Sequence, residues 1–254
     1  MPLHVERRER VAVVTLDDPE RRNALSGELI AEIVAAMDDL ERDDDVGALV
    51  VTGAPPAFCS GADVGHLDRV GVSGNPAAVR SLYDGFLRIR HTALPTVAAV
   101  NGPAVGAGFN LALACDVRLA SPSARFDSRF LRIGLHPGGG HTWMLERAVG
   151  PQATAAMVLF GERLDGERAA AIGLAWRCVP DDELVDTAVA FAARAAEAPR
   201  ELVARTKETL ASLPWQPDFD AAVTTELDVQ WWSFGLRTGT PAPAPVSAPS
   251  TPRA

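Results

Sequence analysis

The chain has 254 residues, of which 47% are hydrophobic, and a formal net charge of -9 at pH 7. This length supplies apolar material for one large core, with room for a small appendage. The acidic balance, without a basic run or a series of stacking aromatics, argues against a nucleic-acid-binding protein. No apolar run is long enough to span a bilayer, so we expect no membrane partner.

Three scattered cysteines, Cys59, Cys115 and Cys178, lack the paired spacing of a metal or redox motif. We therefore expect no metal site and a reducing, cytoplasmic setting. We also expect no targeting leader, because no charged-then-apolar segment opens the sequence.

The first quarter of the chain predicts two strands around one helix. Residues 10–16 (RVAVVTL) predict the first strand. Ser26 is the expected N-cap of a helix whose apolar residues recur at helical spacing from Leu29 to Leu40. A second strand is expected at residues 46–52, followed by the small-residue turn 57–63 (AFCSGAD).

The centre of the chain predicts a strand, a glycine-rich turn and a helix in that order. Residues 96–100 (TVAAV) predict the strand, and Asn101-Gly102-Pro103 predicts its end. Gly106-Ala107-Gly108 then opens an apolar helical segment. A helix start leaves backbone N–H groups available to stabilise negative charge. The residues alone leave open whether the glycines serve that role or only let a buried helix approach a strand.

The remaining expected elements are mostly helical. The expected helices are 78–91, 157–161, 167–174, 183–210 with an interruption at Pro199, and 220–232, and a short strand is expected at 116–120. The final residues are rich in Pro, Ala, Ser and Thr, which predicts a disordered tail. We therefore expect a core at 1–198, a helical region at 199–238 and the tail at 239–254.

Several motifs together resemble the crotonase superfamily, also called the enoyl-CoA hydratase/isomerase family. They are AFCSGAD, NGPAVGAG at 101–108, Phe126 with GLHPGGG at 134–140, and LFGERLDGERAAAIGLAWRCVP at 159–180. The resemblance implies an α/β fold, a crotonase-like spiral of ββα turns with a C-terminal helical region. It implies an acyl-CoA thioester as ligand, with coenzyme A as part of the substrate and no other cofactor. It also implies a homotrimer or a dimer of trimers, to which Trp231 and Trp232 would suit an interface.

The resemblance implies an oxyanion hole made by the backbone N–H groups of Ser60 and Ala107, which would hold the thioester carbonyl oxygen. It further implies coenzyme A contacts from Arg22, Ala62 and Asp63. Without the resemblance, Arg22 is equally compatible with a solvated surface arginine, and Asp63 is compatible with a helix N-cap.

The resemblance also implies that both glutamates used by hydratases of this family are replaced, the first by Asn110 and the second by Phe130. Asparagine can hold a water but exchanges no proton near neutral pH, and phenylalanine does neither. Standard hydratase activity is therefore expected to be weak. His136 and Asp127 are the candidates for a replacement acid or base. The alternative role of His136 is that of a loop histidine bonded to the backbone, and the alternative role of Asp127 is to cap a turn.

His141 and Trp143, near the start of the following helix, are expected to serve packing. Three functions stay open at this point. The first is a divergent crotonase-type lyase or isomerase acting on an acyl-CoA thioester. The second is a catalytically inactive acyl-CoA-binding protein, and the third is a scaffold, against which the two small-residue turns argue.

Overall fold

The computed structural model describes residues 1–63, 65, 67, 72 and 74–240, and it divides the chain into two compact units. The first is Met1–Glu197 and the second Ala198–Ala254. Most of the expected tail, from residue 241 on, lies outside the described residues.

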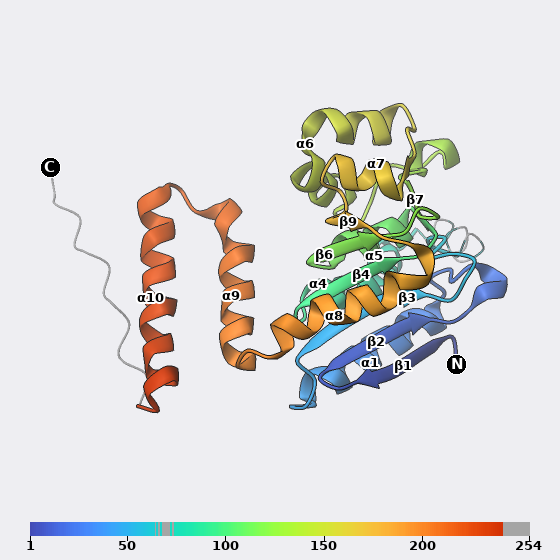
Figure 1. The fold of residues 1–254 in the computed structure, drawn as a ribbon. Helices are drawn as coiled ribbons and strands as arrows, with labels where there is room; N and C mark the ends of the chain where they lie inside the picture. The colour runs from blue at the N-terminus through green and yellow to red at the C-terminus, as the bar shows by residue number, and fades with distance from the viewer. Residues whose placement is uncertain (64, 66, 68–71, 73, 241–254) are drawn as a thin grey trace, which may run out of the picture. The chain divides into compact units, whose positions relative to one another are not determined.

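The first unit is built on a six-stranded sheet in the order β1-β2-β3-β4-β6-β9 (Figure 1). Its strands are β1 (Leu3–Arg8), β2 (Val11–Leu16), β3 (Ala48–Gly53), β4 (Thr96–Val100), β6 (Val117–Ala120) and β9 (Arg177–Cys178). Only the β1–β2 pair is antiparallel among these neighbours. Strand β1 was not expected from the sequence, because five of its six residues are at least partly exposed and it lacks an apolar pattern.

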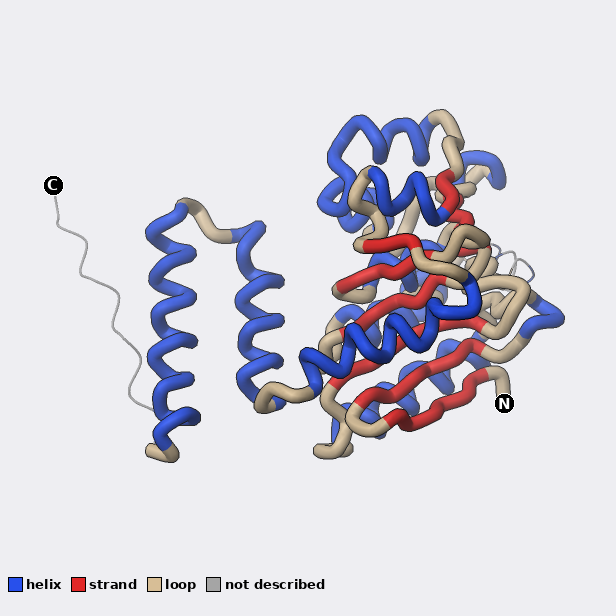
Figure 2. Tube along the Cα trace, viewed as in Figure 1, coloured by secondary structure: helices blue, strands red, loops and turns tan. Residues whose placement is uncertain are grey.

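A second sheet has three strands in the order β5-β7-β8, namely β5 (Pro103–Val105), β7 (Arg125–Asp127) and β8 (Leu164–Asp165). Strands β5 and β7 are parallel, and β8 is antiparallel to β7. Strands of the two sheets alternate along the chain with helices, as Figure 2 shows by colour. The α/β class and the C-terminal helices expected from the sequence are therefore confirmed.

Among its described residues, the first unit holds the helices α1 (Gly27–Arg42), α3 (Pro76–Ser81), α4 (Asp84–Arg90), α5 (Ala107–Ala114), α6 (His141–Leu159), α7 (Gly166–Ala171) and α8 (Leu184–Ala196). Short 3-10 turns are η1 (Pro19–Arg21), η2 (Phe130–Ile133) and η3 (Asp181–Glu183). The predicted cap of α1 is confirmed, since Ser26 Oγ accepts a hydrogen bond from Leu29 N at 3.1 Å.

Two helix predictions need correction. The helix expected at 78–91 is two helices, α3 and α4, because the chain breaks around Leu82 and Tyr83. The helix expected at 157–161 is the end of α6, which starts at His141. Gly150 there adopts φ 76° and ψ 174°, so α6 is kinked before Pro151. A Gly-Pro pair in a sequence predicts a break in a helix, and here the break is a kink within a single helical segment.

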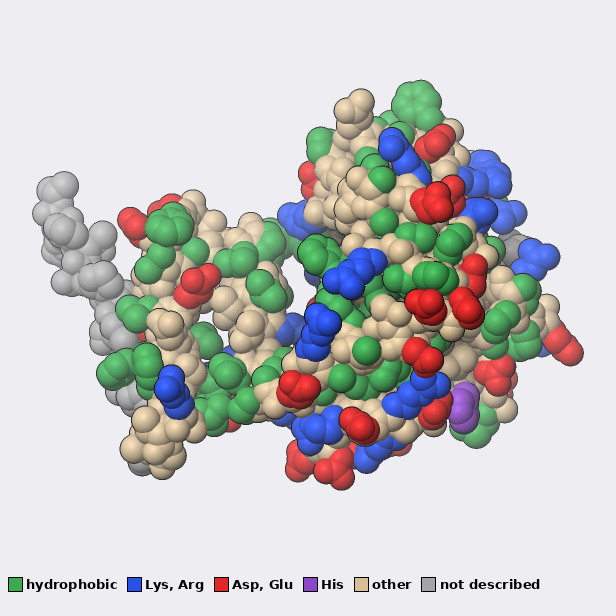
Figure 3. Space-filling view, in the orientation of Figure 1, with side chains coloured by type: hydrophobic (Ala, Val, Ile, Leu, Met, Phe, Trp, Pro, Cys, Tyr) green, Lys and Arg blue, Asp and Glu red, His purple; other side chains and the backbone are tan. Residues whose placement is uncertain are grey.

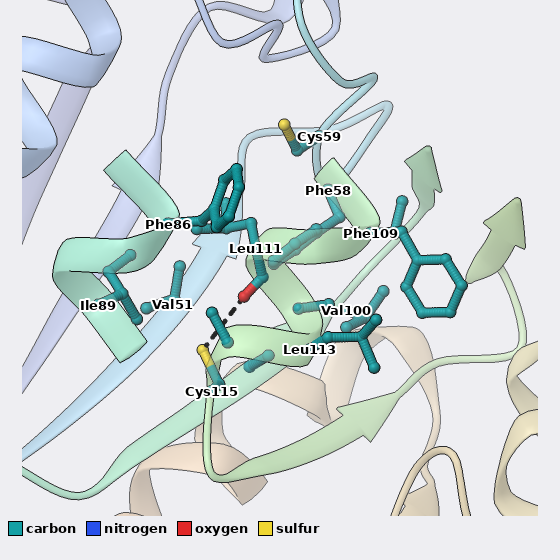
Figure 4. Close-up of a cluster of buried hydrophobic side chains, with 14 of the residues drawn as sticks. Val51, Phe58, Cys59, Phe86, Ile89, Val100, Phe109, Leu111, Leu113 and Cys115 are labelled. Carbon is teal, nitrogen blue, oxygen red and sulfur yellow. Dashed lines mark hydrogen bonds between the residues drawn. The ribbon is translucent and has the colours of Figure 1, made fainter. Parts of the chain in front are cut away.

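Apolar residues cover both faces of the main sheet. Alternate residues of β2 belong to different clusters, Ala12, Val14 and Leu16 to one and Val11 and Val13 to the other. The first cluster packs against α1, α4 and α5, and Figure 4 shows part of it around α5. The second cluster packs against α8, which buries alanines at four-residue spacing. The alternation has period two, as expected for strands buried on both faces.

The second unit contains α9 (Arg200–Ser212), η4 (Leu213–Trp215) and α10 (Phe219–Thr238), with the expected interruption at Pro199 confirmed. The guanidinium of Arg205 on α9 lies 4.0 Å from the ring of Trp232 on α10, which joins the two helices. Figure 3 shows hydrophobic side chains at the surface of these helices. Across the described residues, the structure holds no helix with the length and apolar content needed to cross a membrane.

Candidate active site

The two small-residue turns predicted from the sequence lie in direct backbone contact. Cys59 N donates a hydrogen bond to Pro103 O, and Val105 N donates one to Cys59 O, each at 3.0 Å. Gly61 has φ +100°, and a Cβ added there would lie 2.6 Å from Val105 O. A Cβ on Gly108 would overlap the carbonyl of Cys59. These glycines are therefore required by the close approach of the two turns.

Ala107 occupies the position expected of an anion-binding helix start. It is the first residue of α5, so its N–H has no acceptor within the helix. Among the described residues, no acceptor is found for it elsewhere. The preceding Gly106 has φ 53°, and its N–H donates to Asp127 O at 2.9 Å. This arrangement leaves the Ala107 N–H available for a ligand oxygen.

Ser60 differs from Ala107 in that its N–H is already bonded. Ser60 N donates to Arg22 O at 3.0 Å. A carbonyl oxygen of a ligand would have to share or replace this bond, which was not evident from the sequence.

The three residues expected to contact coenzyme A lie close together along the backbone. Leu25 forms a parallel bridge with Ala62, and Asp63 N donates to Leu25 O at 3.4 Å. Arg22 is exposed and is joined through its carbonyl to Ser60. The turn at residues 57–63 and the segment 22–25 before α1 therefore lie side by side along the backbone.

Asn110, which the resemblance places at the first glutamate position of the family's hydratases, belongs to a buried hydrogen-bonded chain. Asn110 Nδ2 donates to Gly138 O at 2.9 Å, so its Oδ1 faces Nδ1 of His141 at 2.7 Å. Since an amide oxygen only accepts, His141 carries its proton on Nδ1. The unprotonated Nε2 then accepts from Ser128 Oγ at 2.8 Å. Asn110 and His141 are each 1% exposed, and Ser128 is 2% exposed.

The expectation that His141 serves packing alone is incomplete. Its ring does pack against Phe109 and Phe130, with centroid distances of 5.2 and 5.0 Å. Burial lowers the pKa of His141 to about 4, which keeps the imidazole neutral. Ser128 was missed entirely. The only sequence signal was a histidine directly after the three glycines 138–140, which does not reveal its partners.

Phe130, which the resemblance places at the second glutamate position, begins η2 and is half-buried. Its ring lies 3.9 Å from the point where a Cβ on Gly106 would sit, so it flanks the turn that carries Ala107. A hydrophobic ring therefore occupies the region next to the expected oxyanion donor.

The two candidate acid/base residues have different surroundings. The carboxylate of Asp127 accepts from Arg129 N at 3.0 Å and pairs with Arg132 at 2.6 Å and Arg163 at 3.3 Å. This agrees with its alternative role as a turn cap. His136 is exposed, and its Nδ1 lies 2.8 Å from Pro137 O, a backbone contact of the kind its alternative predicted. His136 is not part of the Asn110–His141–Ser128 chain.

Comparison with known proteins shows to which family the chain belongs. The model of the family described as "Enoyl-CoA hydratase/isomerase" matches residues 6–229. The chain is 53% identical over 203 residues to "Probable enoyl-CoA hydratase echA14" of Mycobacterium tuberculosis, covering 80% of this chain and 78% of that protein. It is 36% identical over 200 residues to the 1,2-epoxyphenylacetyl-CoA isomerase of Escherichia coli, covering 77% and 76%.

A Thermobifida fusca homologue solved in complex with acetoacetyl-CoA superposes with a TM-score of 0.84 and 29% identity, covering 92% of this chain and 95% of that chain. The chain belongs to the enoyl-CoA hydratase/isomerase family. The resemblance inferred from the motifs and the fold class that it implied are both confirmed.

Proposed function

We propose that this protein is an enzyme that binds an acyl-CoA thioester and polarises its carbonyl between the turns at 59–61 and 105–108. The observation that carries the proposal is the available N–H of Ala107 at the start of α5, held beside the Ser60 turn by backbone hydrogen bonds. The acetoacetyl-CoA complex of the Thermobifida fusca homologue supports this ligand class. Preorganised N–H donors of this kind stabilise the oxyanion of a reacting thioester.

The proposed reaction is one that needs a polarised thioester without a pair of glutamates. Asn110 has both polar atoms of its amide engaged, and Phe130 offers a hydrocarbon ring. Lyase or isomerase chemistry would need another acid or base, for which His136 stays the candidate with an exposed imidazole. No observation in the described part of the chain favours the alternative of a binding protein without activity.

Replacing Ala107 by Pro should remove the donor and leave the helix in place. Proline is tolerated at the first position of a helix, because that N–H has no intrahelical partner. We expect acyl-CoA to bind two- to tenfold more weakly, since a typical hydrogen bond contributes about 0.5–1.5 kcal/mol. Calorimetry with acetoacetyl-CoA measures the loss.

Free coenzyme A, which lacks the carbonyl, serves as the matched ligand, and its affinity should not change. The control variant Ala107→Ser keeps the N–H and should bind acetoacetyl-CoA like the parent. An equal loss for both ligands, or no loss, would contradict the role of Ala107. Failure of the parent to bind any acyl-CoA would overturn the proposed function itself.

We also propose that the protein is a homotrimer or a dimer of trimers in the cytoplasm. Support for assembly comes from α10, where Val223, Leu227 and Trp231 recur every four residues and are all exposed. Such a stripe is typical of a helix face that packs against another chain.

Replacing Trp231 by Glu should therefore shift the protein toward the monomer. The charge would have to be buried in an apolar interface, which is unfavourable. Size-exclusion chromatography with light scattering gives the mass of each species. Gln230→Glu, which places the same charge on a neighbouring exposed residue, should keep the parent mass. A parent that is already monomeric would rule the assembly out.

A further inference from the structure

The buried chain formed by Asn110, His141 and Ser128 has the order of an orienting group, a base and a nucleophile. We propose that Ser128 accepts the acyl group of the acyl-CoA thioester, so that the protein catalyses acyl transfer to serine and hydrolysis of the resulting ester. This inference rests on the proposed function, because it uses the same thioester site.

The direction of each hydrogen bond supports the assignment. Asn110 is fixed by its bond to Gly138 O, and its Oδ1 holds the proton of His141 on Nδ1. His141 Nε2 therefore faces Ser128 Oγ as an acceptor at 2.8 Å. A base within hydrogen-bond reach of a hydroxyl, itself oriented by a third group, is the arrangement that activates a serine nucleophile. Burial keeps the pKa of His141 near 4, so the Nε2 lone pair carries no proton at neutral pH, while the same burial makes the imidazole a weaker base than an exposed histidine.

The backbone of Ser128 also lies close to that of Ala107, the expected oxyanion donor, because the strands that precede them are paired. It follows directly after β7, whose residue Asp127 accepts a hydrogen bond from the N–H of Gly106 at 2.9 Å. Gly106 is the residue before Ala107. Paired strands β5 and β7 therefore bring the hydroxyl and the N–H donor to the same end of the small sheet. A thioester held at Ala107 would therefore lie at the same end of the small sheet as Ser128, whose hydroxyl is bonded to His141.

The chemical step balances with water as the only further reactant. Ser128 Oγ forms a bond to the thioester carbonyl carbon while its proton passes to His141 Nε2. The C–S bond breaks, and the coenzyme A thiolate takes up that proton and leaves as the thiol. Water then attacks the acyl-serine ester with His141 again as base, which releases the carboxylic acid and restores the hydroxyl.

Two features of the site make this reaction slow. Ser128 is only 2% exposed, and the ring of Phe130 packs against His141. The Phe130 side chain therefore has to turn away before the thioester can approach Ser128. The third group is an asparagine, which stabilises the transient imidazolium less well than a carboxylate. Water reaches this buried ester with difficulty, so the acyl-enzyme is expected to accumulate.

Intact-mass spectrometry of the protein incubated with butyryl-CoA tests the proposal. We expect a mass increase of one butyryl group, located on Ser128 by peptide mapping, and a first release of one equivalent of coenzyme A followed by slower release as the ester is hydrolysed. Ser128→Ala should lose the adduct and slow thiol release at least ~10²-fold. Ser128→Cys should restore the adduct, and Phe130→Ala should form it faster than the parent.

Ser123→Ala, which removes an exposed hydroxyl near the same strand, is the control and should label like the parent. His141→Gln should slow adduct formation while leaving the affinity for butyryl-CoA, measured by calorimetry, within twofold. Binding without any adduct would overturn the nucleophile and leave the proposed function intact. An adduct that persists in Ser128→Ala would equally overturn it, since a thiol such as Cys178 would then be the acceptor. Absence of binding would overturn both proposals.

Discussion

Purified protein is expected to hydrate crotonyl-CoA at least about 10²-fold more slowly than a typical enzyme, for which turnover is about 10 s⁻¹. Hydration requires one group to activate water and another to deliver a proton. The motif resemblance places Asn110 and Phe130 where the family's hydratases carry their two glutamates, and neither side chain can transfer a proton. The loss could reach about 10⁴-fold, because paired catalytic groups act as a unit.

The structure strengthens this expectation beyond the sequence. An asparagine could still have positioned the attacking water, but the Asn110 amide is held by Gly138 O on one side and by His141 Nδ1 on the other. A water would have to break one of these bonds. The measurement is the loss of enoyl absorbance with crotonyl-CoA, and a relative that retains both glutamates is the positive control. Turnover near 10 s⁻¹ by this protein would contradict the account.

Protein stability is expected to fall by up to about 3 kcal/mol, through His141 alone, as the pH is lowered from 6.5 to 4. The pKa of His141 is about 4 in the folded protein, against the ordinary histidine value of 6.5 in an unfolded chain. Between these values the unfolded chain binds the proton and the folded chain does not, so the free energy of unfolding rises with pH. Above pH 6.5 both states are neutral, and the contribution of this residue is constant. Each pKa unit corresponds to about 1.4 kcal/mol.

Urea denaturation at several pH values between 4 and 7.5 measures the effect as a difference between variants. His141→Gln should have a shallower dependence of stability on pH over this range than the parent. It should also be less stable at neutral pH, because the bonds to Asn110 and Ser128 are lost or weakened. His136→Gln removes an exposed histidine and should keep the parent's slope. Parallel curves for the parent and His141→Gln would show that His141 is not held neutral.

Local sequence signals predicted the elements that position the site. The strand at 96–100 and the glycine-rich turn after it were recognisable, because β-branched runs and Gly-Pro turns act over a few residues. The cap at Ser26 was recognisable for the same reason. Strand β1 was not recognisable in the sequence. It is an edge strand that forms by pairing with β2, and its own residue composition does not favour a strand.

The hydrogen bonds that join Asn110, His141 and Ser128 could not be predicted from the sequence, and the reason is geometric. Its three side chains come from α5, the end of β7 and the start of α6, and the bonds join residues 13 and 31 positions apart. Asparagine, histidine and serine are each common in loops and helix starts, so none of them predicts the others. The bond from Ser60 N to Arg22 O was hidden in the same way, because it depends on how two distant turns meet.

A crystal structure with acetoacetyl-CoA tests the central claim, that the two turns hold the thioester carbonyl. The thioester oxygen is expected to lie about 3 Å from Ala107 N, within the range for an oxyanion donor. Ser60 N is expected to turn from Arg22 O toward this oxygen or to share its hydrogen between the two. A bound acetoacetyl-CoA whose thioester oxygen lies away from Ala107 N, with the Ser60–Arg22 bond unchanged, would contradict it.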